Sequence, residues 1–156
     1  MDDRDARQSK PRRWLVLAGG ALACYWLALV VGTHYPFPHG IPTDYSDKEL
    51  HFGAYAGLAF MGAAAWTARW GLRPVGWAIV WVAVVMHGAI DEWTQPPFGR
   101  TCELLDWVAD VLGASLGMAL FLAIAGAVTW AIRRRAKALA NSRADKITEA
   151  IAKRDQ

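Results

Sequence analysis

Four long apolar stretches, separated by short polar segments, account for most of the chain. They cover residues 14–33, 50–68, 74–90 and 108–132. A bilayer core about 30 Å thick needs about 20 helical residues to cross it, and only the third stretch is clearly short of that length. Backbone groups within lipid must be hydrogen-bonded inside their own segment, which favours helices. The pattern therefore predicts an all-α membrane protein, a bundle of four transmembrane helices.

The polar segments between these stretches contain residues that end and begin helices. Residues 34–46 include three prolines and a glycine, which predicts a loop. Ser46 or Asp47 is then placed to cap the second helix. The run Gln95-Pro96-Pro97-Phe98-Gly99-Arg100 breaks the chain again after the third stretch. We expect the fourth helix to resume between Glu103 and Asp106.

Positive charge falls almost entirely on one side of this predicted bundle. Fifteen of the 17 lysines and arginines lie in residues 1–13, 69–73 and 133–156, and the other two are Lys48 and Arg100. Because basic segments stay in the cytoplasm, both termini are predicted to be cytoplasmic. The loops predicted to face outward are 34–49 and 91–107.

This distribution divides the chain into a basic tail, residues 1–13, a membrane domain, residues 14–132, and a second basic tail, residues 133–156. Basic residues beside a membrane favour anionic lipid heads as partners, so the net charge of +3 does not indicate nucleic-acid binding. Ile147, Ala150 and Ile151 have helical spacing, so the second tail is either an amphipathic surface helix or a solvated segment.

Ionisable residues gather where the predicted helices reach the outer side. Asp47, His51 and Tyr55 are four residues apart, which places them on one helix stripe, and Lys48 lies beside it. A histidine at a helix end is commonly a satisfied surface residue, so this stripe alone does not establish a site.

The third and fourth stretches add carboxylates at the same level. Glu92 and Gln95 lie one turn apart at the end of the third stretch, while His87 and Asp91 lie on a neighbouring stripe. Asp91 has the simpler interpretation that it marks the end of the span. At the start of the fourth stretch, the residues that share one face are Asp106, Asp110, Gly113 and Gly117.

Small residues predict how these helices meet. Gly113 and Gly117 form a small-xxx-small pair that permits close packing, and Gly53 and Gly57 offer a counterpart on the second helix. Close packing there would place Asp106 and Asp110 at a helix junction. Ionisable residues inside spans are costly and usually face a partner or a cavity, so Asp110 and His51 are functional candidates.

In order and spacing, these residues resemble the VanZ-like family of small bacterial membrane proteins, over about residues 14–132. The motifs that carry the resemblance are Asp47-Lys48-xx-His51-xxx-Tyr55, Glu92-xx-Gln95, Gly99-Arg100-Thr101 and Asp106-xxx-Asp110-xx-Gly113-xxx-Gly117. The resemblance implies a four-helix domain in the bacterial cytoplasmic membrane and, for the family's namesake, reduced susceptibility to the glycopeptide teicoplanin. It implies no known reaction, and the family often has asparagine at the position of Asp110.

Three functions follow as hypotheses. The first is recognition of a lipid headgroup or cell-envelope precursor at the outer leaflet, with Lys48, Arg100 and protonated His51 receiving a phosphate. The second is an enzyme acting on a lipid-linked substrate, with catalytic candidates His51, Glu92, Asp106 and Asp110. The third is a scaffold in which a salt-bridge network holds the helices together. The residues expected to contact a ligand are Asp47, Lys48, His51, Tyr55, Glu92, Gln95, Arg100 and Asp106.

Cofactor chemistry is left open by the sequence. A divalent metal suits these residue types, but there is no HExxH motif, nucleophile elbow, glycine-rich phosphate loop or cysteine pair. Cys24 and Cys102 fall at different predicted depths, so we expect no disulfide between them. Transport is a weaker hypothesis, because the charges gather at one surface and not at the midplane. The oligomeric state is not predicted.

Overall fold

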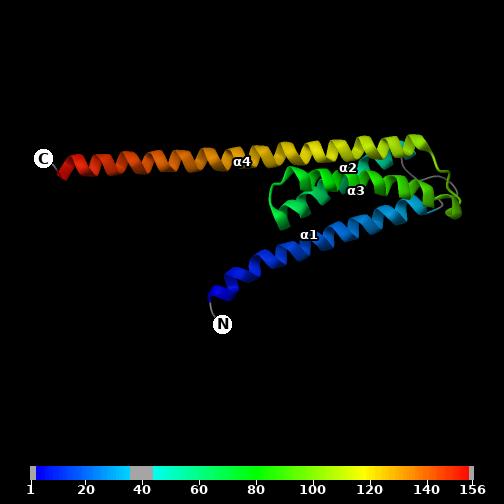
Figure 1. Cartoon of the computed structure of the whole chain (residues 1–156), viewed down its shortest axis with the longest axis horizontal. Helices are drawn as coiled ribbons and strands as arrows, with labels where there is room; N and C mark the ends of the chain where they lie inside the picture. The colour runs from blue at the N-terminus through cyan, green and yellow to red at the C-terminus, as the bar shows by residue number, and fades with distance from the viewer. Residues whose placement is uncertain (1–2, 36–43, 155–156) are drawn as a thin grey trace. The chain divides into compact units, whose positions relative to one another are not determined.

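Helices make up nearly all of the structure, a computed structural model that describes residues 3–35 and 44–154 (Figure 1). The helices are α1 (Asp3–His34), α2 (Asp47–Trp70), α3 (Pro74–Thr94) and α4 (Leu104–Arg154), with a short 3-10 helix, η1 (Pro96–Phe98), between α3 and α4. No strand occurs in the described ranges. The all-α prediction is therefore confirmed.

Three of these helices are long and apolar enough to cross a membrane. The segments concerned are Arg13–His34 of α1, the whole of α3, and Leu104–Ala144 of α4. The third apolar stretch, the shortest in the sequence, thus has the length that a span needs. The chain accordingly has the helical character of a membrane protein.

The ends of α2 follow from local side-chain chemistry. The Ser46 hydroxyl accepts a hydrogen bond from the backbone nitrogen of Glu49, and the Glu49 carboxylate accepts one from the backbone nitrogen of Ser46. This reciprocal capping box satisfies donors that the first helical turn cannot pair internally. Gly71, with φ of 80°, ends the helix in a conformation that favours glycine. Ser46 is therefore the cap, one of the two residues predicted for that role.

The break after α3 lies where the run from Gln95 to Arg100 predicts it. α3 continues past the apolar stretch of residues 74–90 and ends at Thr94. It stops there because Pro96 and Pro97 cannot continue an α-helix, and Gly99 then turns with φ of 79°. Residues 36–43 of the other predicted loop lie outside the described residues.

Two compact units are distinguished along the chain, Met1–Phe121 and Leu122–Gln156. The first contains α1, α2, α3 and the beginning of α4, and half of its apolar core residues belong to α2. Core residues are Leu29, Tyr55, Leu58, Ala59, Val84 and Ala114. The second unit is the remainder of α4, where the Arg134 guanidinium lies over the Trp130 ring. The side chains of Ile147, Ala150 and Ile151 lie outside the described residues, so the amphipathic tail stays a prediction.

Glycines on α4 allow close contact with α2, as predicted, but the register differs. A Cβ at Gly113 would collide with the Phe52 carbonyl oxygen, and one at Gly117 would collide with that of Ala56. Gly57 instead faces the ring of Tyr25 in α1.

The prediction that Gly53 takes part in helix packing is wrong, because a Cβ there would meet no described atom within 4 Å. The backbone of α2 that faces Gly113 is the Phe52 peptide, one position earlier. Gly53 itself points away from that contact and is exposed.

Candidate functional site

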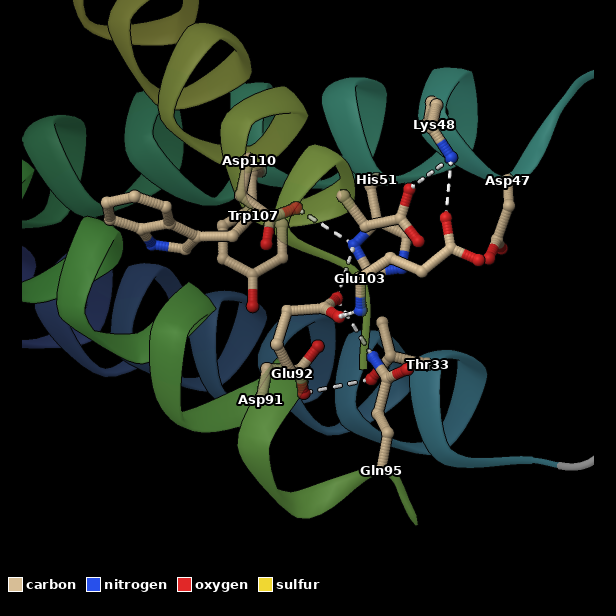
Figure 2. A network of polar contacts seen from close by, with 12 residues as sticks. Thr33, Asp47, Lys48, His51, Asp91, Glu92, Gln95, Glu103, Trp107 and Asp110 are labelled. Carbon is tan, nitrogen blue, oxygen red and sulfur yellow. Dashed lines mark hydrogen bonds and ion pairs between the residues drawn. The ribbon is translucent and has the colours of Figure 1, made fainter. Parts of the chain in front are cut away.

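Polar side chains from three helix ends and one loop converge in the first unit (Figure 2). We call them the polar cluster: Asp47, Lys48, His51, Glu92, Gln95, Arg100, Glu103, Asp106 and Asp110. The start of α2, the end of α3, the loop after η1 and the start of α4 supply these residues. Eight of these nine residues are among those that the sequence singles out, and Glu103 is the addition. Their role in binding or catalysis stays a prediction, and the structure adds their pairing.

Three ion pairs connect the start of α2 to the segment before α4 and to the first turn of α4. An Arg100 guanidinium nitrogen lies 2.6 Å from Asp47 Oδ2. Lys48 Nζ lies 3.0 Å from both Glu103 Oε2 and Asp106 Oδ1. Arg100 therefore pairs with Asp47. Glu103, which the sequence marks only as a possible start of the fourth helix, therefore belongs to the polar cluster.

The pair of Lys48 and Glu103 keeps its charges over a wide pH range. Hydrogen bonds with Glu103 and Asp106 raise the pKa of Lys48 from 10.5 to about 12. The hydrogen bond from Lys48 lowers the pKa of Glu103 below its ordinary value of 4.5. The stabilisation from Lys48 is present below pH 10.5 and lost as pH rises through 12. The stabilisation from Glu103 is present above pH 4.5 and lost as pH falls below it. The ion pair between Lys48 and Glu103 is therefore intact at neutral pH.

The buried centre of the cluster is a histidine held by a carboxylate. His51 Nδ1 lies 2.9 Å from Asp110 Oδ1 and 3.6 Å from Glu92 Oε1. His51 is 3% exposed, and Asp110 is completely buried. Gly88 of α3 makes room for this pair, because a Cβ there would lie 2.9 Å from Asp110 Oδ2. Gly88 was not predicted, since a single glycine in an apolar stretch carries no spacing signal.

Glu92 joins the end of α3 to the beginning of α4. Its Oε1 accepts a hydrogen bond from Gln95 Nε2 at 3.2 Å, and its Oε2 accepts one from the backbone nitrogen of Glu103 at 3.0 Å. Both carboxylate oxygens therefore have a protein donor. Glu92 is 3% exposed, so it does not mark the point where α3 enters water.

Tyr55 lies one turn after His51 on α2 and contacts a second histidine, His87. Its ring is parallel to that of His51, with centroids 6.4 Å apart. The indole nitrogen of Trp26 donates to His87 Nε2 at 2.7 Å, and His87 Nδ1 lies 2.9 Å from the Tyr55 hydroxyl. Both His87 nitrogens have partners, so His87 is satisfied structurally.

Asp91 belongs to a neighbouring group that the sequence did not predict. Thr33 Oγ1 donates to Asp91 Oδ1 at 2.9 Å, and His34 Nδ1 lies 3.5 Å from the same oxygen. Asp91 is 2% exposed, so it turns inward against α1 and does not simply end a span. A polar pair directly after an apolar run resembles an ordinary helix end, which is why Thr33 and His34 were overlooked.

Several buried polar atoms at this end of the bundle lack a hydrogen-bond partner among the described residues. They are His51 Nε2, Asp91 Oδ2, Gln95 Oε1, Asp106 Oδ1 and Asp110 Oδ2. Of these, Asp106 Oδ1 has the Lys48 ammonium 3.0 Å away as an ion-pair partner. A buried polar atom without a partner costs free energy, so each calls for an explanation. The four oxygens can only accept hydrogen bonds or bind cations.

A cavity of about 250 Å³ reaches the cluster between α1 and α2. Thr33, Asp47, His51 and Arg100 form its polar side, and Ala28, Leu29, Gly32 and Leu50 form its apolar side. The cavity therefore combines ionisable groups with a hydrocarbon surface. Lys48 does not line it, because that side chain is held between Glu103 and Asp106.

No family model matches the chain, and comparison with curated proteins and with solved structures returns no similar protein. The fold and the site therefore define the class: an all-helical chain with membrane-compatible helices and a buried cluster of ionisable residues.

Proposed function

We propose that this chain is a VanZ-like protein of the bacterial cytoplasmic membrane that crosses it four times and has both termini in the cytoplasm. The apolar character of α1, α3 and α4 and the basic residues beside them support this arrangement. The polar cluster then lies at the outer leaflet.

In this arrangement α2 is the remaining span. Its 24 residues rise about 36 Å as a helix, which is sufficient for a bilayer core of about 30 Å. The hydropathy of α2 falls below that of the other three spans because glycines, His51 and Tyr55 interrupt its apolar residues and because charged residues occupy its two ends, while alanine and glycine make up much of the remainder. Such small residues suit a helix that contacts neighbouring helices on several sides, and Tyr25, Val80 and Gly113 all approach it.

The proposed function is recognition of a lipid headgroup or a lipid-linked envelope precursor at the outer leaflet. The observation that carries it is the cavity, in which Arg100, His51 and Asp47 face an apolar wall from α1. Lipid-linked ligands present this same combination of a polar head on an apolar stem.

Arg100 is the residue best placed to bind a phosphate within that cavity. Its guanidinium has five N–H donors in all, and the ion pair with Asp47 engages one of its nitrogens. Because a guanidinium can present two parallel donors to a phosphate, it would bind the headgroup while remaining paired with Asp47. Lys48 has a supporting role, since its ammonium group already bridges two carboxylates.

Substituting Arg100 tests this proposal. We expect Arg100→Gln, in the full-length protein in detergent, to bind a polyprenyl phosphate at least about tenfold more weakly, the value of one charged hydrogen-bonding group. Native mass spectrometry against the same lipid measures the change. Arg69→Gln, at the opposite end of α2, is the matched control and should bind normally. Unchanged binding by a folded Arg100→Gln protein would contradict the proposal.

A cellular readout applies to the same variants. If the chain alters teicoplanin susceptibility when expressed, Arg100→Gln should abolish the effect at equal protein level, whereas Arg69→Gln should retain it. A phenotype that survives Arg100→Gln would show that the cavity is not responsible.

One observation favours an enzyme as a second candidate. His51 is oriented through Nδ1 by Asp110, and its ring lines the cavity, which is the arrangement of a general base held by a carboxylate. Incubation of the protein with lipid-linked substrates, followed by product analysis, separates turnover from binding. Absence of product from a protein that binds the lipid would exclude catalysis on that substrate.

A further inference from the structure

His51 presents an imidazole nitrogen that the protein does not use. Asp110 accepts a hydrogen bond at Oδ1, so the proton on this side of the ring belongs to His51 Nδ1. The lone pair of a neutral ring then lies on Nε2, which is buried and has no partner among the described residues. A histidine held at one nitrogen by a carboxylate, with the other nitrogen free, is the usual arrangement of a metal ligand.

Carboxylates stand at the right distance from this histidine. Ligand atoms of Asp47, His51 and Asp106 all lie within 4.8 Å of one another. Metal–ligand bonds of about 2.0–2.2 Å place two ligand atoms up to about 4.4 Å apart, so small side-chain rotations would complete a site. Arg100 and Lys48 each lie within ion-pair distance of a single oxygen of Asp47 and Asp106, respectively, which leaves a second oxygen on each carboxylate for a metal.

The charge balance of the polar cluster also favours a cation. It contains the five carboxylates of Asp47, Glu92, Glu103, Asp106 and Asp110 against the two fixed cations of Lys48 and Arg100. Unpartnered oxygens of Gln95 and Asp110 lie in the same cluster. Excess negative charge and unpaired acceptors both indicate a positively charged ligand.

We propose that His51, Asp47 and Asp106 bind one divalent transition-metal ion, through His51 Nε2 and one carboxylate oxygen from each aspartate. The mixture of imidazole and carboxylate suits Mn²⁺ or Zn²⁺. The site goes beyond headgroup recognition, because its ligands all come from the protein and no lipid is required to complete them.

An alternative set, His51 with Asp91 and Glu92, also has ligand atoms within 4.8 Å. It is less suitable, because the histidine nitrogen 3.6 Å from Glu92 is Nδ1, which Asp110 already engages. Both oxygens of Glu92 also accept hydrogen bonds from the protein.

Three protein ligands leave coordination positions for water or for a ligand oxygen. Because Asp47 and His51 line the cavity, those positions are accessible from it. The ion and Arg100 could then bind the same phosphate.

Metal binding by the full-length protein in detergent tests the inference without any lipid. After EDTA treatment, the protein is dialysed against Mn²⁺ and, separately, Zn²⁺, and bound metal is measured per chain. We expect one ion per chain and a loss of at least about tenfold in affinity for His51→Gln. His87→Gln is the matched control, because both of its ring nitrogens have protein partners, and it should retain the ion. Failure of the wild-type protein to bind either metal overturns the inference, as does full binding by His51→Gln.

Two further measurements keep the test independent of whether His51→Gln folds. In the wild-type protein loaded with Mn²⁺, pulsed electron paramagnetic resonance should detect one imidazole nitrogen coupled to the metal, and absence of that coupling overturns the inference. Asp47→Asn should weaken metal binding while Asp91→Asn leaves it unchanged, and the reverse order overturns the assignment of ligands. None of these outcomes depends on lipid binding, so failure here is distinct from failure of the proposed function.

Discussion

Replacing Gly113 with alanine is expected to destabilise the first unit by about 1–3 kcal/mol, the usual cost of overpacking. The added Cβ would occupy the position of the Phe52 carbonyl oxygen. That oxygen belongs to the backbone of α2, so it cannot rotate away as a side chain would, and α2 and α4 must separate. Reversible denaturation of the purified protein in detergent, followed by tryptophan fluorescence, measures the change.

Gly53→Ala is the matched control for this substitution. It adds the same methyl group to a helix of the same unit, where no described atom lies within 4 Å. Alanine is the better helix former, so stability should be unchanged or greater by up to about 1 kcal/mol. Equal destabilisation by the two substitutions would show that the contact between Gly113 and Phe52 does not hold α2 against α4.

The comparison of Gly113 with Gly53 also shows what a sequence can predict about helix packing. Spacing identifies Gly113 and Gly117 as the close-packing face of α4, because a small-residue stripe is a property of one helix. The partner surface depends on the relative register of two helices, which no local pattern specifies. The glycine pair on α2 was consequently predicted one residue away from the Phe52 and Ala56 carbonyls that form the contact.

The polar cluster shows the same division between local and tertiary information. Helical spacing predicts that Asp47 and His51 share a stripe, and that Asp106 and Asp110 share another, since these relations lie within single helices. Which acid pairs with which base depends on tertiary geometry, so the partnership of Arg100 with Asp47 could not be predicted.

The burial of the acids near the end of α3 could not be predicted, for a related reason. Consecutive acidic residues after an apolar run usually enter water, which is the simpler interpretation that the sequence gives for Asp91. Asp91 and Glu92 are instead buried, because Thr33 of α1 and the backbone nitrogen of Glu103 donate hydrogen bonds to them. These donors come from segments distant in sequence, and only the folded chain brings them to the carboxylates.

Asp110→Ala is expected to destabilise the first unit by about 3–5 kcal/mol, because removing one member of a buried pair leaves the other without a partner. His51 is 3% exposed, so water does not readily replace the lost carboxylate. Asp110→Asn should be much milder, since its side-chain oxygen can still accept a hydrogen bond from His51 Nδ1. Denaturation in detergent measures both variants against the wild-type protein.

The double variant His51→Ala/Asp110→Ala distinguishes a specific pair from a general loss of packing. If the hydrogen bond between His51 and Asp110 causes the destabilisation, the double variant should be more stable than the sum of the two single effects implies, by about 0.5–3 kcal/mol. Strictly additive losses would mean that the two residues act independently. A folded Asp110→Asn protein that binds neither metal nor lipid would then oppose the scaffold hypothesis, because its helices would be intact while its ligand chemistry was lost.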